Sequence, residues 1–291
     1  MDRHLRGIDH IVVGVRELEQ AAAQWQRLGF TTTTVGRHIG WTTANICVML
    51  EEGYIELLTG VEPAAPRHAL AELLAQRGEG GLGIALATDD AAGTAAAWRR
   101  IGLEVTGPES LARRLRSDGD EIELRFRNVT PRLCELSGLA CFACFHETPE
   151  SLRRPEWLRH ANGALRLRSC TILADPPDAV AAALTRLLGN HTVATTDNVI
   201  TFHLGRQALV VAPVEDVRLF HPELAELEAS PLPRLVAAEI EVLDLQTTRR
   251  VLERQGIPYS TGPDGILLDP AMTHGLAIEL VAPVAAAPAH S

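Results

Sequence analysis

The sequence predicts an α+β fold built from four consecutive βαβββ modules. The first observation behind this prediction is a pattern that occurs four times: an apolar, β-branched stretch is followed by a segment with helical spacing that stops at a glycine. The helices are expected at Leu18–Leu28, Ala91–Ile101, Ala179–Leu188 and Leu245–Gln255, with stops at Gly29, Gly102, Gly189 and Gly256. The second observation is the spacing: counting back 19 residues from each glycine reaches the first strand of its module, at His10, Gly83, Cys170 and Ala237.

Each helix is followed by segments that we expect to be strands. In the first module these are Phe30–Val35, Asn45–Leu50 and Tyr54–Leu58, and the second module is expected to close with Leu139–Phe145. The last module ends with Leu276–Val281, where AIELVAP has the same pattern as YIELLTG in the first. A repeat with antiparallel strands around each helix excludes a doubly wound sheet and a TIM barrel.

The composition is typical of a soluble globular protein without a nucleic-acid or membrane partner. The chain has 291 residues, which is enough for two domains. Of these residues, 46% are hydrophobic and 22% are charged. Its net charge of −10 argues against nucleic-acid binding, and it has no apolar run of transmembrane length and no signal-peptide core. Five irregularly spaced cysteines indicate reduced thiols, so we expect a cytoplasmic location. Cys141 and Cys144 form a C-x-x-C pattern in an apolar strand, where core cysteines are the favoured interpretation.

Lysine is absent, and all 27 basic residues are arginines. This excludes Schiff-base lysine chemistry and a P-loop. The chain also has no G-x-S-x-G elbow and no G-x-G-x-x-G that opens a helix, so the common hydrolase and dinucleotide-binding classes lose support. Together with the richness in alanine, the lack of lysine is typical of a high-GC genome, which we expect to be bacterial.

Several motifs resemble those of one superfamily. The opening DHIVV (residues 9–13), GYIELL (53–58) and LAIELVAP near the C-terminus resemble the vicinal oxygen chelate superfamily, which includes glyoxalase I, extradiol dioxygenases and fosfomycin-resistance proteins. Four further stretches are similar to its glyoxalase-like branch: RHIGWTTAN (37–45), CFHETPE (144–150), RPEW (154–157) and HANGA (160–164). The resemblance implies that paired modules form two open barrels, each with eight strands around a cavity.

The same resemblance implies a domain organisation. A glyoxalase-like domain of two modules would cover residues 1–146, and a second, degenerate one would cover residues 165–284. The segment 147–164, rich in charge and proline, is the expected linker, and residues 285–291 are a C-terminal tail.

In this superfamily a divalent metal ion stabilises negative charge on a substrate with two neighbouring oxygens. Carried over residue by residue, the resemblance implies His10, Glu56 and His146 as metal ligands, whereas Gly83 stands where a second first-strand histidine would be. Two histidines and one carboxylate with open positions suit iron, manganese or nickel, or zinc with waters. No catalytic residue is assigned.

Each implied ligand has a structural alternative. His10 is also explained as a buried core histidine bonded to a backbone carbonyl. Glu56 lies between two apolar residues, so an alternating strand could point it at solvent, and His146 could cap the exit of the chain from its strand.

Three residues are candidates for substrate binding: His38, Trp41 and Asn45. Trp41 lies in a glycine-flanked loop and is suited to the mouth of a cavity. For His38 and Asn45, a structural role in a turn and a strand is an equal alternative.

The second half lacks a complete ligand set, because its corresponding positions are Cys170, Leu209, Ala237 and Glu279. Extradiol dioxygenases that resemble this architecture bind iron with their C-terminal modules, so that activity is disfavoured. Two functions stay open: a metal-dependent lyase or isomerase acting on a small vicinal-oxygen substrate, and a metal-free protein that binds or sequesters a small molecule such as an antibiotic. Pairing of modules within one chain or across a homodimer is open as well.

Overall fold

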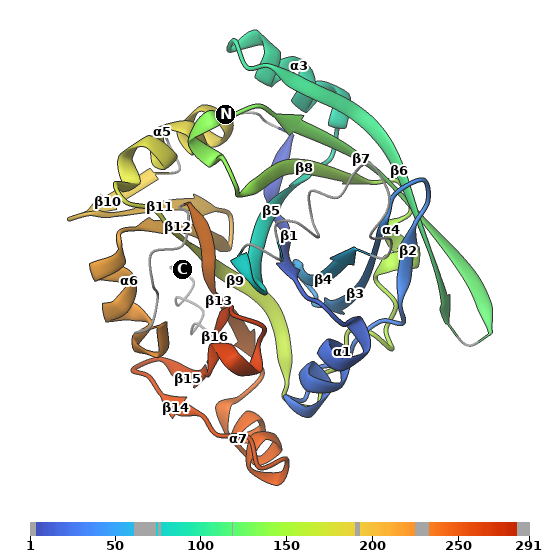
Figure 1. Cartoon of the computed structure of the whole chain (residues 1–291), viewed down its shortest axis with the longest axis vertical. Helices are drawn as coiled ribbons and strands as arrows, with labels where there is room; N and C mark the ends of the chain where they lie inside the picture. Colours follow the sequence, from blue (N-terminus) through green and yellow to red (C-terminus); the bar gives the residue numbers. More distant parts are fainter. Residues whose placement is uncertain are drawn as a thin grey trace, which may run out of the picture.

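The computed structural model describes residues 4–60, 74, 77–117, 119–189, 193–224 and 233–283. It confirms the predicted α+β fold: two eight-stranded sheets lie side by side, and the sheet of the first half closes into a barrel. Figure 1 shows the barrel in blue to green and the sheet of the second half in yellow to red. The tail expected at residues 285–291 lies outside the described residues.

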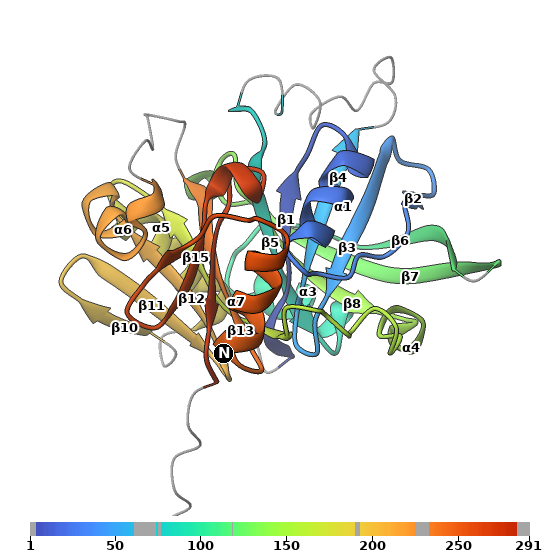
Figure 2. The same ribbon diagram turned by 90° about the horizontal axis from the view of Figure 1, so that it is seen from below.

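The first half contains the barrel and its helices. Its strands follow one another around the barrel in the order β1-β4-β3-β2-β6-β7-β8-β5. The elements in chain order are β1 (Leu5–Gly14), α1 (Leu18–Arg27), β2 (Gly36–His38), β3 (Thr43–Met49), β4 (Tyr54–Gly60), β5 (Gly80–Thr88), α3 (Ala91–Arg100), β6 (Val105–Ser117), β7 (Asp120–Pro131), η1 (Cys134–Leu136), β8 (Ala140–His146) and α4 (Pro149–Leu152). The long β6–β7 hairpin extends beyond the rest of the barrel (Figure 2).

The second half contains a sheet of the order β10-β11-β12-β9-β13-β16-β15-β14. Its elements are β9 (Ala164–Leu173), α5 (Pro177–Leu188), β10 (Val193–Thr196), β11 (Val199–Leu204), β12 (Gln207–Ala212), α6 (Val214–Phe220), η3 (Pro222–Leu224), β13 (Arg234–Val242), α7 (Leu245–Arg254), β14 (Ser260–Thr261), β15 (Gly265–Leu268), η4 (Pro270–Met272) and β16 (Ala277–Val281). Strand β13 packs against β5 of the barrel, and one apolar core runs through both halves.

The strand pairing explains the fourfold spacing of the sequence. In every module the first strand pairs in parallel with the last, as β1–β4, β5–β8, β9–β12 and β13–β16. The first strands of the two modules in each half pair antiparallel, as β1–β5 and β9–β13. Each half therefore consists of two copies of one unit joined along their first strands.

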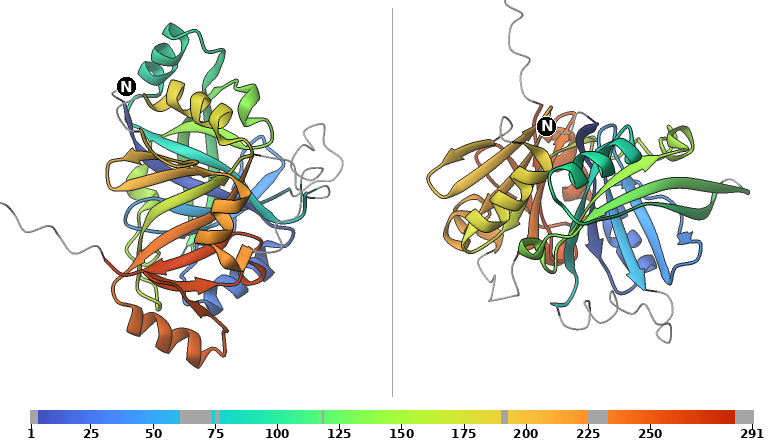
Figure 3. Two further views of the ribbon diagram at one scale, coloured as in Figure 1. Left: turned by 90° about the vertical axis from the view of Figure 1, so that its left-hand side faces the viewer. Right: turned by 90° about the horizontal axis from the view of Figure 1, so that it is seen from above.

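The four predicted helices are confirmed as α1, α3, α5 and α7, and they lie on the outer faces of the sheets (Figure 3). Two of them begin at an aspartate whose side chain accepts a hydrogen bond from the first turn: Asp90 from the Gly93 N–H, and Asp244 from the Thr247 N–H. The glycines that follow the four helices have φ between +63° and +91°, which residues with a side chain rarely adopt. In the described part of the chain, no helix is long and apolar enough to cross a membrane.

The strand predicted at Phe30–Val35 is wrong, because this segment has no regular structure. At the end of α1 the Phe30 N–H donates a hydrogen bond to the Trp25 carbonyl, and the centroids of the two rings are 5.2 Å apart. Thr33 bonds Cys47 twice, donating its N–H to the carbonyl and accepting the Cys47 N–H at its hydroxyl. Threonine side chains thus replace part of the strand ladder, and the first pairing strand starts only at β2.

The segment expected to link the halves, residues 147–164, is packed against the barrel. It contains α4, and the side chains of Leu152 and Trp157 are buried beside Tyr54. Asn162 is fully buried, and its amide donates to the Leu28 carbonyl while its oxygen accepts the Ala164 N–H. These contacts fix where the second half begins relative to the barrel.

Candidate functional site

The barrel encloses a cavity of about 1090 Å³. Five of the six residues singled out from the sequence line it: His10, His38, Trp41, Glu56 and His146. Asn45 lies buried beside the cavity and bonds one of them. The rest of the wall is mainly leucine and aromatic side chains, so the polar groups are gathered in a mostly apolar chamber.

A β-bulge in β1 brings two consecutive polar residues into this region. Ile8 pairs with Leu86 and His10 pairs with Ala85, so Asp9 is an extra residue in the β1–β5 ladder. A bulge bends the strand and breaks the strict alternation of side chains. Asp9 and His10 are therefore both buried, with 5% and 4% of their surfaces exposed, and their side chains contact each other.

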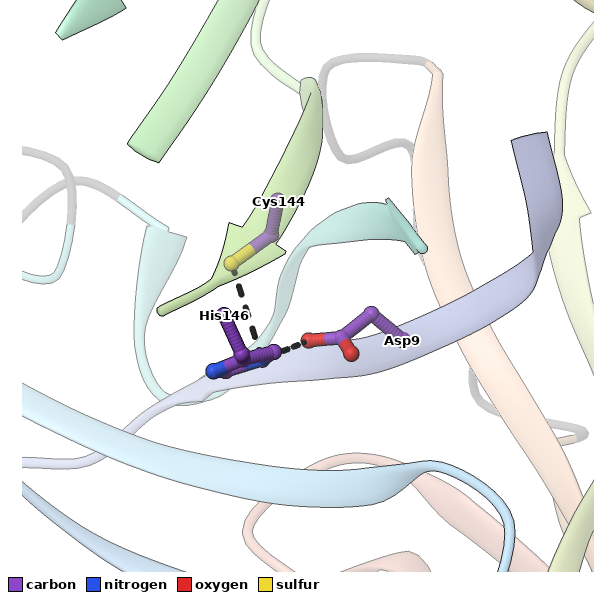
Figure 4. Close-up of side chains that lie close together, drawn as sticks. All are labelled: Asp9, Cys144 and His146. Carbon is purple, nitrogen blue, oxygen red and sulfur yellow. Dashed lines mark hydrogen bonds and ion pairs between the residues drawn. The ribbon is translucent and has the colours of Figure 1, made fainter. Parts of the chain in front are cut away.

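Asp9 joins the first strand to the last strand of the barrel's second module (Figure 4). Its Oδ2 accepts hydrogen bonds from His10 Nδ1 at 2.6 Å and from His146 Nε2 at 2.9 Å. Burial alone would raise the pKa of the Asp9 carboxyl, but the two imidazoles outweigh it and hold this pKa below its usual range. Asp9 is therefore an ionised acceptor between two histidines.

Glu56 on β4 is the centre of a second polar group. It is 8% exposed and faces inward, which excludes the alternative in which it points at solvent. Its Oε2 lies 3.5 Å from His10 Nε2, its Oε1 lies 3.9 Å from His38 Nε2, and the Asn45 amide donates to Oε1. Burial would raise the pKa of Glu56, but His10, His38 and Arg113 with the Asn45 hydrogen bond hold it lowered, so the carboxylate is ionised.

Both imidazoles that face Glu56 are held from behind. His10 uses Nδ1 for Asp9 and stacks on the Tyr54 ring with a centroid distance of 4.4 Å. His38 shares a hydrogen bond between Nδ1 and the Thr43 hydroxyl, at 2.9 Å. Burial lowers the pKa of His38 below its ordinary value. The outer hydrogen bonds leave Nε2 of each ring directed at the carboxylate, as in protein sites that bind metals through histidine.

The positions of possible ligand atoms differ in part from the set implied by the sequence. His10 and Glu56 are brought together, whereas the Nε2 of His146 is directed at Asp9. Among the described residues, one trio has all its ligand atoms within 4.8 Å of one another: Asp9, Cys144 and His146. Cys144, interpreted from the sequence as a core cysteine, lines the cavity with Sγ 3.7 Å from His146 Nε2 (Figure 4). Burial raises the pKa of this thiol far above its usual range, which makes it a weak ligand.

The residues present fit a divalent ion at His10 and Glu56. In the tautomer that donates Nδ1–H to Asp9, the Nε2 lone pair of His10 faces an ionised carboxylate oxygen at 3.5 Å. Two acceptors in this position repel each other unless a proton on Nε2 or a metal cation lies between them, so the pair suits either an ion pair or a metal ion. Ligand atoms on a tetrahedral zinc ion stand about 3.4 Å apart, close to the separation found here.

Two functional residues were missed in the sequence. Asp9 precedes His10, and strict alternation would place it on the opposite face of the strand, since a bulge has no sequence signal of its own here. Arg113 on β6 is 4% exposed and lines the cavity, and Leu111 and Leu115 lie on the same side of the strand. The period of two in Leu111, Arg113 and Leu115 is a signal that could have found it.

In the second half, three of the four corresponding positions are buried and carry no histidine or carboxylate, and the fourth is a glutamate. Cys170, Leu209 and Ala237 are buried in the sheet and its core. Glu279 lies on β16 opposite Glu239, and burial together with the Glu239 charge raises its pKa to about 7.

Comparison with known proteins identifies the family. A family model described as a glyoxalase-like domain matches residues 8–188, more than half of the chain. The chain belongs to this family. The glyoxalase-like protein is thus a member of the vicinal oxygen chelate superfamily, as its motifs predicted. None of the curated proteins matches it.

Solved structures share the fold of the glyoxalase-like protein at low sequence identity. A hypothetical protein from Staphylococcus aureus superposes with a TM-score of 0.68 at 14% identity, over 95% of this chain and 99% of that one. The Mn(II)-bound glyoxalase from Novosphingobium aromaticivorans superposes with a TM-score of 0.56 at 12% identity, over 96% of this chain and 82% of that one. A mutant of 4-hydroxymandelate synthase from Streptomyces coelicolor superposes with a TM-score of 0.58 at 12% identity, over 96% of this chain and 93% of that one. At these identities the likeness establishes the fold alone.

Proposed function

We propose that the glyoxalase-like protein is a metal-dependent lyase or isomerase that binds a small substrate with two neighbouring oxygens in the barrel cavity. The observation that carries the proposal is the pair of possible ligand atoms 3.5 Å apart, His10 Nε2 and Glu56 Oε2, on two side chains that are each held by an outer hydrogen bond. The structural likeness to a Mn(II)-bound glyoxalase supports a divalent ion; iron, manganese, nickel and zinc all accept this donor set.

His10 and Glu56 would hold the ion, with His146 as the third protein ligand. His146 bonds the same oxygen of Asp9 as His10 does, and because its Nε2 donates there, its Nδ1 would be the atom that binds the ion. The ion would act as a Lewis acid that stabilises negative charge on the substrate oxygens. The chain itself fixes the His10 ring through Asp9 and Tyr54, and the leucine and aromatic walls exclude water from the bound substrate.

Elemental mass spectrometry on protein purified without a His-tag tests the metal. Near-stoichiometric transition metal in the wild type, lost in His10→Ala and Glu56→Ala, supports the proposal. His203→Ala is the matched control, because this histidine is exposed on β11 and does not line the cavity. Loss in His146→Ala but not in His38→Ala would identify the third ligand. The absence of metal after incubation with divalent iron, manganese, nickel and zinc contradicts the proposal.

A second candidate is a metal-free protein that binds or sequesters a small molecule such as an antibiotic. It is favoured by Gly83, where a fourth ligand would be needed: a Cβ there would lie 2.5 Å from the Ala140 carbonyl oxygen, so no histidine fits. The mainly apolar wall of the cavity also suits tight binding without turnover. Metal-independent ligand binding by calorimetry, with no conversion of the ligand, would favour this candidate.

A further inference from the structure

A buried arginine faces the cavity from β6. Side chains alternate along this strand, so Arg113 points inward while its neighbour Arg114 is exposed and pairs with Glu123 at 2.9 Å. Arg113 is 4% exposed, which is rare for an arginine and requires compensation of its charge. The polar atoms that face it determine whether the charge is satisfied within the chain.

The guanidinium of Arg113 has few partners in the described residues. Its Nη1 donates to the Cys47 sulfur at 3.1 Å, and burial raises the pKa of that thiol to about 11, so the acceptor is neutral and weak. The buried Nε has no hydrogen-bond partner, and the described residues form no direct ion pair with Arg113. Burial alone would lower the pKa of Arg113, but the acidic groups around it, Cys47, Tyr54 and Glu56, outweigh this effect and keep the guanidinium charged. A charged fork with five donors is thus left largely unsatisfied beside a cavity.

The position of Arg113 is fixed by its neighbours. Arg113 pairs with His38 across the β2–β6 ladder, and its stem packs over Gly36. A Cβ at Gly36 would lie 2.7 Å from the Arg113 Cδ and 2.7 Å from the Asn45 Oδ1, so the glycine leaves the space that the arginine occupies. The guanidinium is therefore held close to the Glu56 group, on the same side of the chamber.

We infer that the cavity binds a small organic anion whose carboxylate is held by Arg113 and whose body is apolar or aromatic. Because a guanidinium presents parallel donors, it matches a carboxylate in a bidentate pair. The walls next to Arg113 are Leu111, Leu124 and Phe126, which suit an apolar body. Asn128 lines the same wall, and its buried amide oxygen has no hydrogen-bond partner in the described part of the chain. The inference deepens the proposed function, since it names the substrate class of the same cavity, but it does not need the metal.

Isothermal titration calorimetry with benzoate and its neutral isostere benzamide tests this inference. The titrations use chelator-treated protein and, separately, protein loaded with Mn²⁺. We compare the wild type with Arg113→Met, which keeps the length of the stem, and with Arg114→Met as the matched exposed control. In the wild type, benzoate is expected to bind at least about 10-fold more tightly than benzamide, with a dissociation constant below about 10 mM.

The variants separate the arginine from the metal. Arg113→Met is expected to weaken benzoate binding about 10- to 100-fold and to leave benzamide unchanged, while Arg114→Met changes neither. The same dependence on Arg113 in chelator-treated protein supports the anion site even if the metal proposal fails. Benzoate binding that requires Mn²⁺ and is unchanged in Arg113→Met overturns the anion site and leaves the metal site standing.

Two results in the wild type alone also overturn the inference, so it can be tested even if Arg113→Met does not fold. One is equal affinity for benzoate and benzamide. The other is no benzoate binding up to about 10 mM in either preparation.

Discussion

His10 and Asp9 are neighbours in the sequence, yet the Nδ1 of His10 donates to the Oδ2 of Asp9 at 2.6 Å, and both side chains are buried, with His10 lining the barrel cavity. A regular strand would point them to opposite faces. The β1 bulge thus supplies His10 with its own orienting carboxylate, and the same oxygen also holds His146.

Asp9→Asn is expected to weaken divalent metal binding about 10- to 100-fold, because outer partners fix the ring orientation and tautomer of histidine ligands. The amide offers a weaker acceptor than the ionised carboxylate and cannot hold both imidazoles equally well. Calorimetric titration with Mn²⁺ measures the effect. Asp120→Asn, an exposed change at the start of β7, is the control. An unchanged dissociation constant in Asp9→Asn would show that Asp9 does not orient a ligand.

Asn45→Leu is expected to weaken metal binding about 10-fold without moving the strand. The change removes the amide that donates to Glu56 Oε1, which raises the pKa of the carboxyl and loosens its orientation. The pH dependence of Mn²⁺ binding should move to higher pH in the variant, since a proton competes better for Glu56. Identical binding profiles in the variant and the wild type would contradict the role given to Asn45.

Gly83→His is expected to destabilise the barrel by about 2 kcal/mol or more and to add no ligand. A Cβ at this position would lie 2.5 Å from the Ala140 carbonyl oxygen and 2.6 Å from the Ala140 Cβ. Urea unfolding measures the loss, and Thr130→His on the exposed face of β7 controls for the size of the new side chain. A variant of normal stability with tighter metal binding would show that the position can accept a fourth ligand.

Glu279→Gln is expected to stabilise the protein at alkaline pH. Burial and the Glu239 charge raise the pKa of Glu279 in the folded state to about 7, above its ordinary value of 4.5. Between these values the folded state holds a proton that the unfolded state has lost, so the stability of the wild type falls as the pH rises from about 4.5 to about 7. The variant lacks this titration.

Unfolding curves recorded from about pH 4 to about pH 8 should therefore diverge, with Glu279→Gln more stable by about 1 kcal/mol at the upper end and equal to the wild type at the lower end. Glu19→Gln on the exposed side of α1 is the control. A constant difference between Glu279→Gln and the wild type across this range would contradict the raised pKa.

The fold could be predicted because it depends on spacing that repeats. Each module can be recognised by the glycine after its helix and by the constant distance from that glycine back to the first strand. The spacing is constant because every module has the same structure, in which the first strand pairs in parallel with the last. The Phe30–Val35 prediction failed because threonine hydroxyls bond the backbone in place of a partner strand. The β-propensity of threonine does not distinguish a backbone that bonds a partner strand from one that bonds threonine hydroxyls.

The site could be predicted where side chains follow alternation. His10 and Glu56 lie in apolar strands, and the structure brings them within 3.5 Å. Asp9 could not be found this way, because it enters the site through an irregularity in the ladder. Arg113 was hidden for another reason: it stands next to the exposed Arg114, and a pair of arginines is usually a solvated surface feature.

The bulge in β1 has a consequence for how such a barrel can diversify. Asp9, like Arg6, is a residue that the β1–β5 ladder leaves without a direct partner, so its side chain can be exchanged without changing the register of the strands around it. Strand pairing therefore does not depend on this side chain. A mutation of Asp9 can alter the orientation of His10 while the neighbouring β1–β5 residue pairs stay the same. Substitutions at Asp9 can therefore vary the setting of His10 while the strand scaffold is kept.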